Sequence, residues 1–182
     1  MSLSMDSRLP LPNPAGFDSE QQAIYDSILA SRGDLSGPFL AWMHSPRFAS
    51  LAEKLGAFCR YHTELELIES ELLILCVARH FSCVGEQQIH EPIAESAGLP
   101  LEQIDALREG RPVQFENVRL QLLYDAARSL LGTNRLPQPL YEALVAQFGV
   151  PCVVEIVGVI GYYSLVAMTL NAFEMRKAST LG

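Results

Sequence analysis

The amino-acid sequence predicts an all-α fold. Apolar residues recur at helical spacing along most of the 182 residues, and many of these stretches start at a capping residue and stop at a glycine. Alternation of apolar and polar residues, the pattern of a half-buried strand, is nowhere convincing. Because 49% of the residues are apolar, the chain can bury a core. We expect one helical domain over 18–177, after an extended segment at 1–17 and before a tail at 178–182.

The first elements follow from prolines, caps and glycines. Three prolines lie within 5–17, so this part should run extended over the surface and form no helix. Asp18 or Ser19 then caps a helix that ends at Gly33. After a loop and a short apolar turn at 38–43, Ser45 caps the next helix, which starts at Pro46.

The helix from Pro46 to about His62 is expected to be amphipathic. Its apolar residues recur at helical spacing on one side, and its charged residues lie opposite them. The apolar side comprises Phe48, Leu51, Leu55, Phe58 and Cys59, and the polar side comprises Glu53, Lys54 and Arg60.

The stretch 68–90 holds the residues best suited to chemistry. Residues 72–78 are apolar around nearly the whole helix, which predicts a buried helix, so Glu71 should need a partner. The alternative is that Glu71 caps the helix start and meets solvent. The following segment, which runs to Gly98, places Cys83, Glu86 and His90 on one face. Pro92 should bend this helix and open space beside the imidazole.

Four more helices complete the prediction. They are expected at 101–108, from about 117 to Gly132, at 138–148 before Gly149, and at about 151–175. The last contains a charge-free run of about membrane-spanning length. Its tyrosines lie in the middle of the run, and positive charge flanks one end only, so we interpret it as a core helix. Small residues at Gly158, Gly161 and Ser164 would let another helix or a neighbouring subunit approach closely.

Composition and charge exclude several classes of function. The formal net charge is −8 and no basic stripe is present, so a nucleic-acid partner is not expected. The four cysteines are scattered, three of them in apolar segments, which indicates reduced core thiols and a cytoplasmic protein that does not bind a membrane. No secretory signal opens the chain. Metal-ligand spacings are lacking, so neither a metal nor a cofactor is expected.

The arrangement of Glu71, Cys83, Glu86 and His90, followed by Gly98-Leu99, resembles the carboxymuconolactone decarboxylase family, which includes the alkylhydroperoxidase D proteins. The resemblance covers about residues 8–175. Its further matches are Gly37-Pro38-Phe39, His44-Ser45-Pro46, Val154-Glu155-Ile156 and Ile160-Gly161-Tyr162. It implies a bundle of about seven to eight helices and a homo-oligomer, whether trimer, hexamer or dimer.

The sequence departs from both branches of that family. The peroxidase branch carries a Cys-x-x-Cys pair, but the position of the second cysteine is Glu86 here. A sulfenic acid on Cys83 would therefore lack a local resolving thiol. The decarboxylase-like branch has a glutamate four residues before the histidine, as Glu86 and His90 are here, but its usual aromatic residue is replaced by Gln87.

Three functions are compatible with these residues. The first is acid–base chemistry on a small oxygenated organic acid or lactone: His90 moves the proton, Glu86 fixes its tautomer, and a buried Glu71 of raised pKa donates a proton or orients the ring. The second is a thiol peroxidase using Cys83, with its pKa lowered by the helix start and His90, unless Cys83 is a small core residue. The third is a non-catalytic oligomeric binding module.

Residues that bind the substrate are expected among aromatic side chains around His90. Trp42 and Tyr162 are the candidates we select. The resemblance also implies a place in the pocket for His44, and a local role in its turn is the alternative.

Overall fold

The computed structural model describes residues 5–33, 35 and 37–178. The ends of the expected N-terminal segment and tail, and part of the loop before Pro38, lie outside the described residues. The described chain is helical apart from one short β-ribbon, which confirms the all-α class. Its helices are α1 Ser19–Arg32, α2 Phe39–Trp42, α3 Pro46–Tyr61, α4 Leu67–His80, α5 Val84–Ser96, α6 Leu101–Glu109, α7 Val118–Thr133 and α8 Gln138–Ala172.

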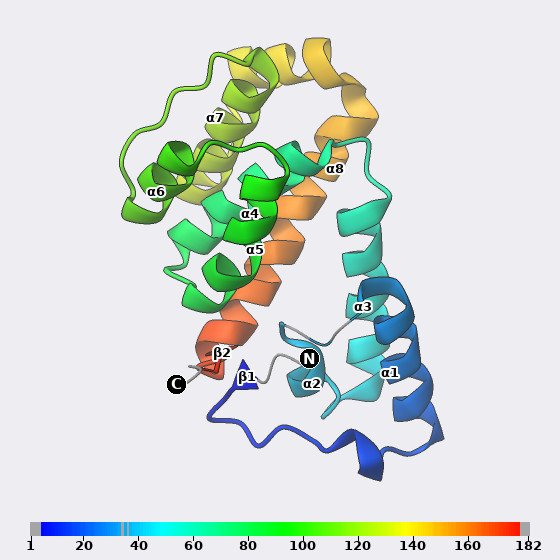
Figure 1. Ribbon diagram of the computed structural model, residues 1–182. Coiled ribbons are helices and arrows are strands. Elements are labelled where there is room, and N and C mark those ends of the chain that lie inside the picture. Colours follow the sequence, from blue (N-terminus) through cyan, green and yellow to red (C-terminus); the bar gives the residue numbers. More distant parts are fainter. Residues whose placement is uncertain (1–4, 34, 36, 179–182) are drawn as a thin grey trace.

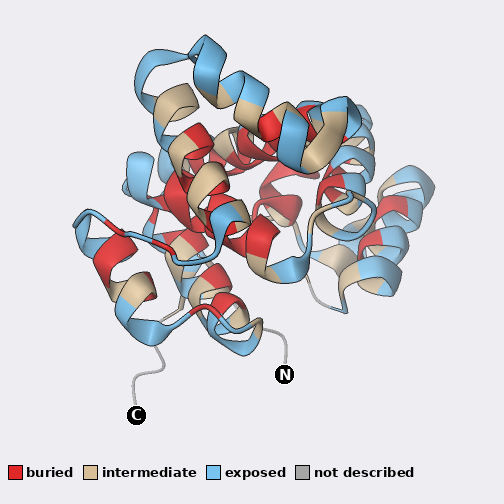
Figure 2. Cartoon of the chain, turned by 90° about the horizontal axis from the view of Figure 1, so that it is seen from above, coloured by how far each residue is buried: buried red, intermediate tan, exposed pale blue. Residues whose placement is uncertain are grey.

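Helices α4 and α8 form the centre of the bundle (Figure 1). Helix α4 packs against α5, α6, α7 and α8, while α3 packs against α8 and carries α1 on its other side. Viewed from above, buried segments gather in the middle and exposed segments surround them (Figure 2). The two short strands lie at one end of α8, where β1 Met5–Asp6 pairs antiparallel with β2 Arg176–Lys177.

Helix α4 is buried over its middle because it is apolar on every side. All residues from Glu69 to Ala78 are buried. Glu69 receives two hydrogen bonds from Arg119, at 2.5 and 3.0 Å, and also accepts the backbone N–H of Glu66. Glu66 is therefore the N-cap of this helix and Glu69 completes its capping box, and the alternative of a solvent-exposed Glu71 at the helix start is wrong.

Helix α3 buries a different face from the one expected, although Cys59 is buried as predicted. Leu51 is 70% exposed and Leu55 is 50% exposed, whereas Glu53 is only 5% exposed. The face that packs inward consists of Ala49, Ala52, Glu53, Gly56 and Cys59. The cause is at Gly56, where a Cβ would overlap the hydroxyl of Tyr162 on α8. Small residues permit this close approach, and the large apolar side chains consequently point outward.

Helix α8 joins the two helices expected on either side of Gly149. Gly149 has a left-handed φ of 78° with an extended ψ of 159°, so it turns the chain between the two helical parts. By length and composition α8 is the one helix of the described chain apolar enough to cross a membrane, and 39% of its most apolar window is buried. Since it lies at the bundle centre against α3, α4 and α7, we retain the interpretation as a core helix.

The N-terminal segment differs from the expectation at one turn. Pro14–Gly16 forms a single turn of 3-10 helix, whose Ala15 N–H donates to the side chain of Asn13 at 3.0 Å. Proline is compatible with the first position of a helix because it needs no N–H there. The expectation that 5–17 contains no helix is therefore wrong for Pro14–Gly16.

Candidate active site

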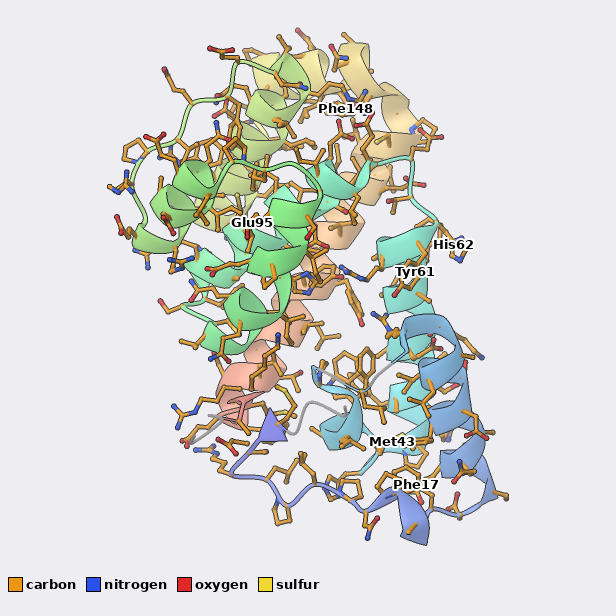
Figure 3. The ribbon with its side chains drawn as sticks, viewed as in Figure 1. Phe17, Met43, Tyr61, His62, Glu95 and Phe148 are labelled. Carbon is orange, nitrogen blue, oxygen red and sulfur yellow. The ribbon has the colours of Figure 1, made fainter. Side chains whose placement is uncertain are left out.

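His90 lines a cavity of about 320 Å³ between α3, α5 and α8. The His90 side chain is 7% exposed, so the cavity reaches a ring that the fold otherwise encloses. Figure 3 shows Tyr61 near the end of α3, and its side chain forms part of the same wall. The other principal lining residues are Arg32, Phe39, Arg60, Glu86, Ile89, Pro92, Ile93, Tyr162, Tyr163 and Lys177.

Glu71 holds one side of the imidazole. Its Oε2 lies 2.7 Å from Nδ1 of His90, and its Oε1 accepts a hydrogen bond of 2.7 Å from Nη1 of Arg60. Burial alone would raise the pKa of Glu71, but the hydrogen bonds and charges of His90 and Arg60 outweigh it and lower the pKa. Glu71 is therefore an ionised carboxylate that keeps a proton on Nδ1.

Glu86 lies on the other side of the ring. Its Oε2 is 3.3 Å from Nε2 of His90, yet the geometry forms no hydrogen bond, and this buried oxygen has no hydrogen-bond partner among the described residues. Burial raises the pKa of Glu86, and the negative charge of Glu71 adds to the effect against the positive groups nearby. The neutral acid is therefore favoured at this position.

Glu71 orients the imidazole, which was one of the two roles expected for it, whereas Glu86 forms no hydrogen bond to the ring. The expected raised pKa of Glu71 is wrong: the pKa of Glu71 is lowered and that of Glu86 is raised. The pKa of Glu71 is lowered by the hydrogen bond and charge of His90 and then by those of Arg60, which reaches Glu71 from α3. Sequence reasoning missed Arg60, since an arginine in the last turn of a helix is ordinarily a solvated residue near exposed carbonyls.

Two tyrosines of α8 complete the inner wall. Tyr163 packs edge-on against His90, with ring centroids 5.4 Å apart and planes at 88°, and Tyr162 packs against Tyr163 in the same manner. Burial raises the pKa of both phenols, so they stay protonated at neutral pH. Tyr162 thus lines the cavity at the place expected of a substrate-binding residue.

Trp42 and His44 lie outside this cavity. The indole N–H of Trp42 donates to Thr169 Oγ1 at 3.2 Å, and Nε2 of His44 lies 2.8 Å from the carbonyl oxygen of Pro10. Both residues instead line a groove at the junction of α2, α3 and the end of α8. The expectation that they share the His90 cavity is wrong, because Trp42 is directed to Thr169 on α8 and His44 to Pro10 in the N-terminal segment.

Cys83 is buried rather than activated. It is the residue before α5, has no exposed surface, and is not among the residues that line the His90 cavity. Burial raises the pKa of its thiol to about 11, although the backbone amides of Glu86 and Gly85 act in the other direction. The expected lowering of this pKa is therefore wrong. Cys76 lines a different pocket, and all four cysteines are free thiols.

Pro92 contributes to the cavity wall without ending α5. Helix α5 continues to Ser96, although Pro92 cannot donate to the carbonyl of Gln88. That carbonyl instead accepts a hydrogen bond of 2.8 Å from Nζ of Lys177, and the side-chain oxygen of Gln88 accepts the Lys177 backbone N–H. The strand β2 is thereby attached to the rim of the cavity.

A metal ion has little support from the donor set at this site. Over the described ranges, no group of three or more His, Cys, Asp or Glu side chains is placed to hold one. Arg60 already supplies the positive charge beside Glu71.

Comparisons with known proteins identify the fold. No family model and no curated protein sequence matches the chain. An alkylhydroperoxidase AhpD core structure, an uncharacterized peroxidase-related protein from Ralstonia eutropha JMP134, matches with a TM-score of 0.78 at 16% identity, covering 95% of this chain and 93% of that one. A peroxidase-related protein from Silicibacter sp. TM1040 matches with a TM-score of 0.78 at 14% identity, covering 95% and 92%. The debrominase Bmp8 matches with a TM-score of 0.73 at 12% identity, and the match covers 95% of this chain and 91% of that one.

Proposed function

The chain has the alkylhydroperoxidase D-like helical fold, and from the site that this fold holds we propose an acid–base enzyme. Its substrate is a small oxygenated organic acid or lactone that enters the cavity beside His90. The fold alone does not select this chemistry, because one fold hosts many reactions. The proposal depends on His90 and Glu86, which line the cavity, and on Glu71, which is buried behind the ring and contacts its Nδ1.

One observation carries the proposal: two buried glutamates flank the same imidazole, with pKa values displaced in opposite directions. Such pairs are typical of sites that separate the roles of acid and base. Glu71 holds the proton on Nδ1, so Nε2 is the nitrogen that exchanges a proton with a substrate. Glu86, favoured as the neutral acid, lies next to Nε2 and can donate a hydrogen bond.

A decarboxylation illustrates how these residues would act. The bond from carbon to the departing carboxylate breaks, carbon dioxide leaves, and the electron pair moves onto the carbon and its adjacent carbonyl oxygen. Neutral Glu86 donates a hydrogen bond to the enolate oxygen, which steadies this charge. The imidazolium Nε2–H of His90 then protonates the carbon, and water returns the proton to His90.

A thiol peroxidase is the second candidate, since two of the similar structures are named peroxidase-related. A Cys83 thiolate would attack the peroxide, releasing water or an alcohol and forming a sulfenic acid, which external thiols would reduce. Burial of Cys83 and its raised pKa make this candidate the weaker one. If it were right, peroxide consumption would disappear in Cys83→Ser; consumption that survives the change dismisses it.

Turnover of a panel of β-keto acids and carboxylated lactones tests the proposal. Carbon dioxide release and deuterium uptake from solvent measure this turnover. Wild-type protein should turn over at least one member, and His90→Gln should abolish that turnover. Glu71→Gln should reduce it by roughly a hundredfold or more, in the range of a lost general acid–base interaction. Glu69→Gln is the matched control.

Glu69 is buried in the same helix as Glu71 but pairs with Arg119, away from the cavity. Its substitution should lower stability and leave the rate of the folded fraction unchanged. Full activity of His90→Gln would overturn the acid–base proposal. No turnover of any member by the wild type would favour the non-catalytic module.

We also propose that the chain assembles as a cytoplasmic homo-oligomer through the outer faces of α3 and α8. Large apolar side chains are exposed there, among them Leu51 and Val154, which is 66% exposed. A Cβ at Gly158 or Gly161 would meet nothing within 4 Å, so no other part of the described chain covers these glycines. A second copy packed on this surface would bury it.

A further inference from the structure

The wall of the His90 cavity contains a cation that the described residues leave without an acceptor. Arg32, at the end of α1, lines the cavity, and its Nε and Nη2 are buried with no hydrogen-bond partner among the residues that the structure describes. Leaving buried N–H groups of a charged side chain unpaired costs free energy, and most such groups in proteins are satisfied. The buried Nε and Nη2 of Arg32 therefore need an acceptor outside the described residues.

The guanidinium of Arg32 is held in place by its neighbours. Its central carbon lies 4.7 Å from the ring centroid of Phe39 and 5.8 Å from that of Tyr61, within the range of cation–π contacts. Nη2 packs against Gly56, where an added Cβ would lie 2.9 Å away. These contacts fix the position of the cation but offer its N–H groups no oxygen.

The other two cations of the wall already have acceptors. Arg60 donates to Glu71, and Nζ of Lys177 donates to the carbonyl of Gln88. In the described part of the cavity wall, Arg32 is thus the cation whose N–H groups remain to be satisfied. An anionic oxygen group of a bound molecule is the chemical partner that would satisfy them.

We infer that Arg32 binds the carboxylate of a small substrate, and that the aromatic walls around it hold the carbon skeleton and direct it toward His90. The substrate class is a compact monoanion or dianion whose unionised part fits between Phe39, Tyr61 and Tyr162 in about 320 Å³. This assignment depends on the proposed function only in placing the reacting carbon at His90. Arg32 itself acts in binding and specificity.

Calorimetric titration with matched pairs of probes tests this assignment: benzoate against benzamide, and propionate against propionamide. The members of each pair are nearly identical in shape and differ in charge. Wild-type protein should bind at least one carboxylate tenfold or more tighter than its amide. Arg32→Met and Arg32→Gln should lose this preference, and Arg32→Lys should keep part of it.

Arg47→Met is the control for charge, because Arg47 is exposed on α3 and does not line the cavity. It should bind all probes as the wild type does. Equal binding of carboxylate and amide by the wild type, failure of every probe to bind, or an undiminished preference in Arg32→Met would each overturn the inference. Should Arg32→Met not fold, Arg32→Lys and the wild-type preference still decide.

The same titrations separate this inference from the proposed function. His90→Gln should retain the preference for carboxylates, because it leaves Arg32 in place. If His90→Gln were fully active while the preference still depended on Arg32, acid–base catalysis by His90 would fail and the binding site would stand. If activity depended on His90 but no preference depended on Arg32, carboxylate binding by Arg32 would fail and acid–base catalysis by His90 would stand.

Discussion

At the residue scale, the two glutamates beside His90 differ in the hydrogen bonds that they form. Glu71 shares Arg60 with the imidazole, whereas the buried Oε2 of Glu86 has no hydrogen-bond partner in the described chain. Identical side chains in two environments thus favour opposite protonation states. The site depends on this difference, since an ionised Glu71 positions the ring and a neutral Glu86 can donate.

Glu86 should make stability depend on pH. Burial raises its pKa above 4.5, so the folded chain retains a proton that the unfolded chain releases. As pH rises from 4.5 through the folded pKa, the free energy of unfolding should fall, by at most about 1.4 kcal/mol per pH unit. Glu86→Gln should remove this slope in urea titrations from about pH 5 to 8. An unchanged slope would show that another group is responsible.

Glu71 should act in a separate window, with the opposite sign. Its lowered folded pKa means that its stabilising contribution is present above the ordinary value of 4.5 and is lost as pH falls through the folded pKa. Glu71→Gln should therefore reduce the dependence of the free energy of unfolding on pH below 4.5. The dependence above pH 4.5, which comes from Glu86, should remain. Acid unfolding of the variant measured by circular dichroism checks this.

Cys83 should react slowly with alkylating reagents. Because its thiol is buried and its pKa is raised to about 11, only about one part in ten thousand is thiolate at pH 7. Iodoacetamide labelling of the native protein, read by mass spectrometry, should modify Cys83 far more slowly than in the urea-unfolded chain. Labelling at the rate of the unfolded chain would contradict the burial of Cys83 and would favour the thiol peroxidase candidate.

Sequence reasoning found the residues of α4 and α5 but not their partners. Glu71 stood out because an ionisable side chain on an apolar helix needs a partner, and Glu86 and His90 followed from helical spacing and the family resemblance. Arg32 and Arg60 carry no such signal. They reach the site only because α1 and α3 pack beside α5 and α8, and tertiary contacts of this kind are absent from local patterns.

At the scale of elements, close approach at Gly56 determines how α3 packs. Gly56→Ala would place a Cβ against Tyr162 Oη and Arg32 Nη2, so α3 or the tyrosine must move. We expect a loss of about 1–3 kcal/mol in the free energy of unfolding, as in other overpacked cores. Gly132→Ala is the control, because a Cβ there meets nothing within 4 Å, and it should stabilise the helix by about 0.5–1 kcal/mol.

Denaturant unfolding of both glycine variants measures these effects. Equal stability of Gly56→Ala and wild type would mean that α3 and α8 do not approach as closely as described. Retained activity in a destabilised Gly56→Ala would show that the cavity tolerates a displaced Tyr162.

Element boundaries were predictable where capping chemistry fixed them. Asp18 forms the capping box of α1 with Gln21, and Gly33 ends that helix in a left-handed conformation, both as expected. The buried face of α3 was not predictable, because its large apolar side chains outnumber the small residues that pack inward. Amphipathic patterns identify an apolar face but do not say whether the chain itself or a second copy covers it.

At the scale of the whole molecule, the outer faces of α3 and α8 should control assembly. Leu55→Glu and Val154→Glu place charges on the exposed apolar surface and should shift the molecular mass toward the monomer in light scattering after gel filtration. Val118→Glu is the matched control, since Val118 is 63% exposed at the start of α7. If none of the three substitutions changes the molecular mass, this surface is not the interface.

The position of the proton on His90 tests the central claim most directly. Nitrogen-15 NMR of the imidazole distinguishes its two nitrogens in the folded protein. We predict that the neutral ring carries its proton on Nδ1, held by Glu71, and that this preference is lost in Glu71→Gln. A neutral ring protonated on Nε2 in the wild type would contradict the account, because Glu71 would then not hold the proton on Nδ1 and Nε2 would not be the nitrogen that exchanges a proton with the substrate.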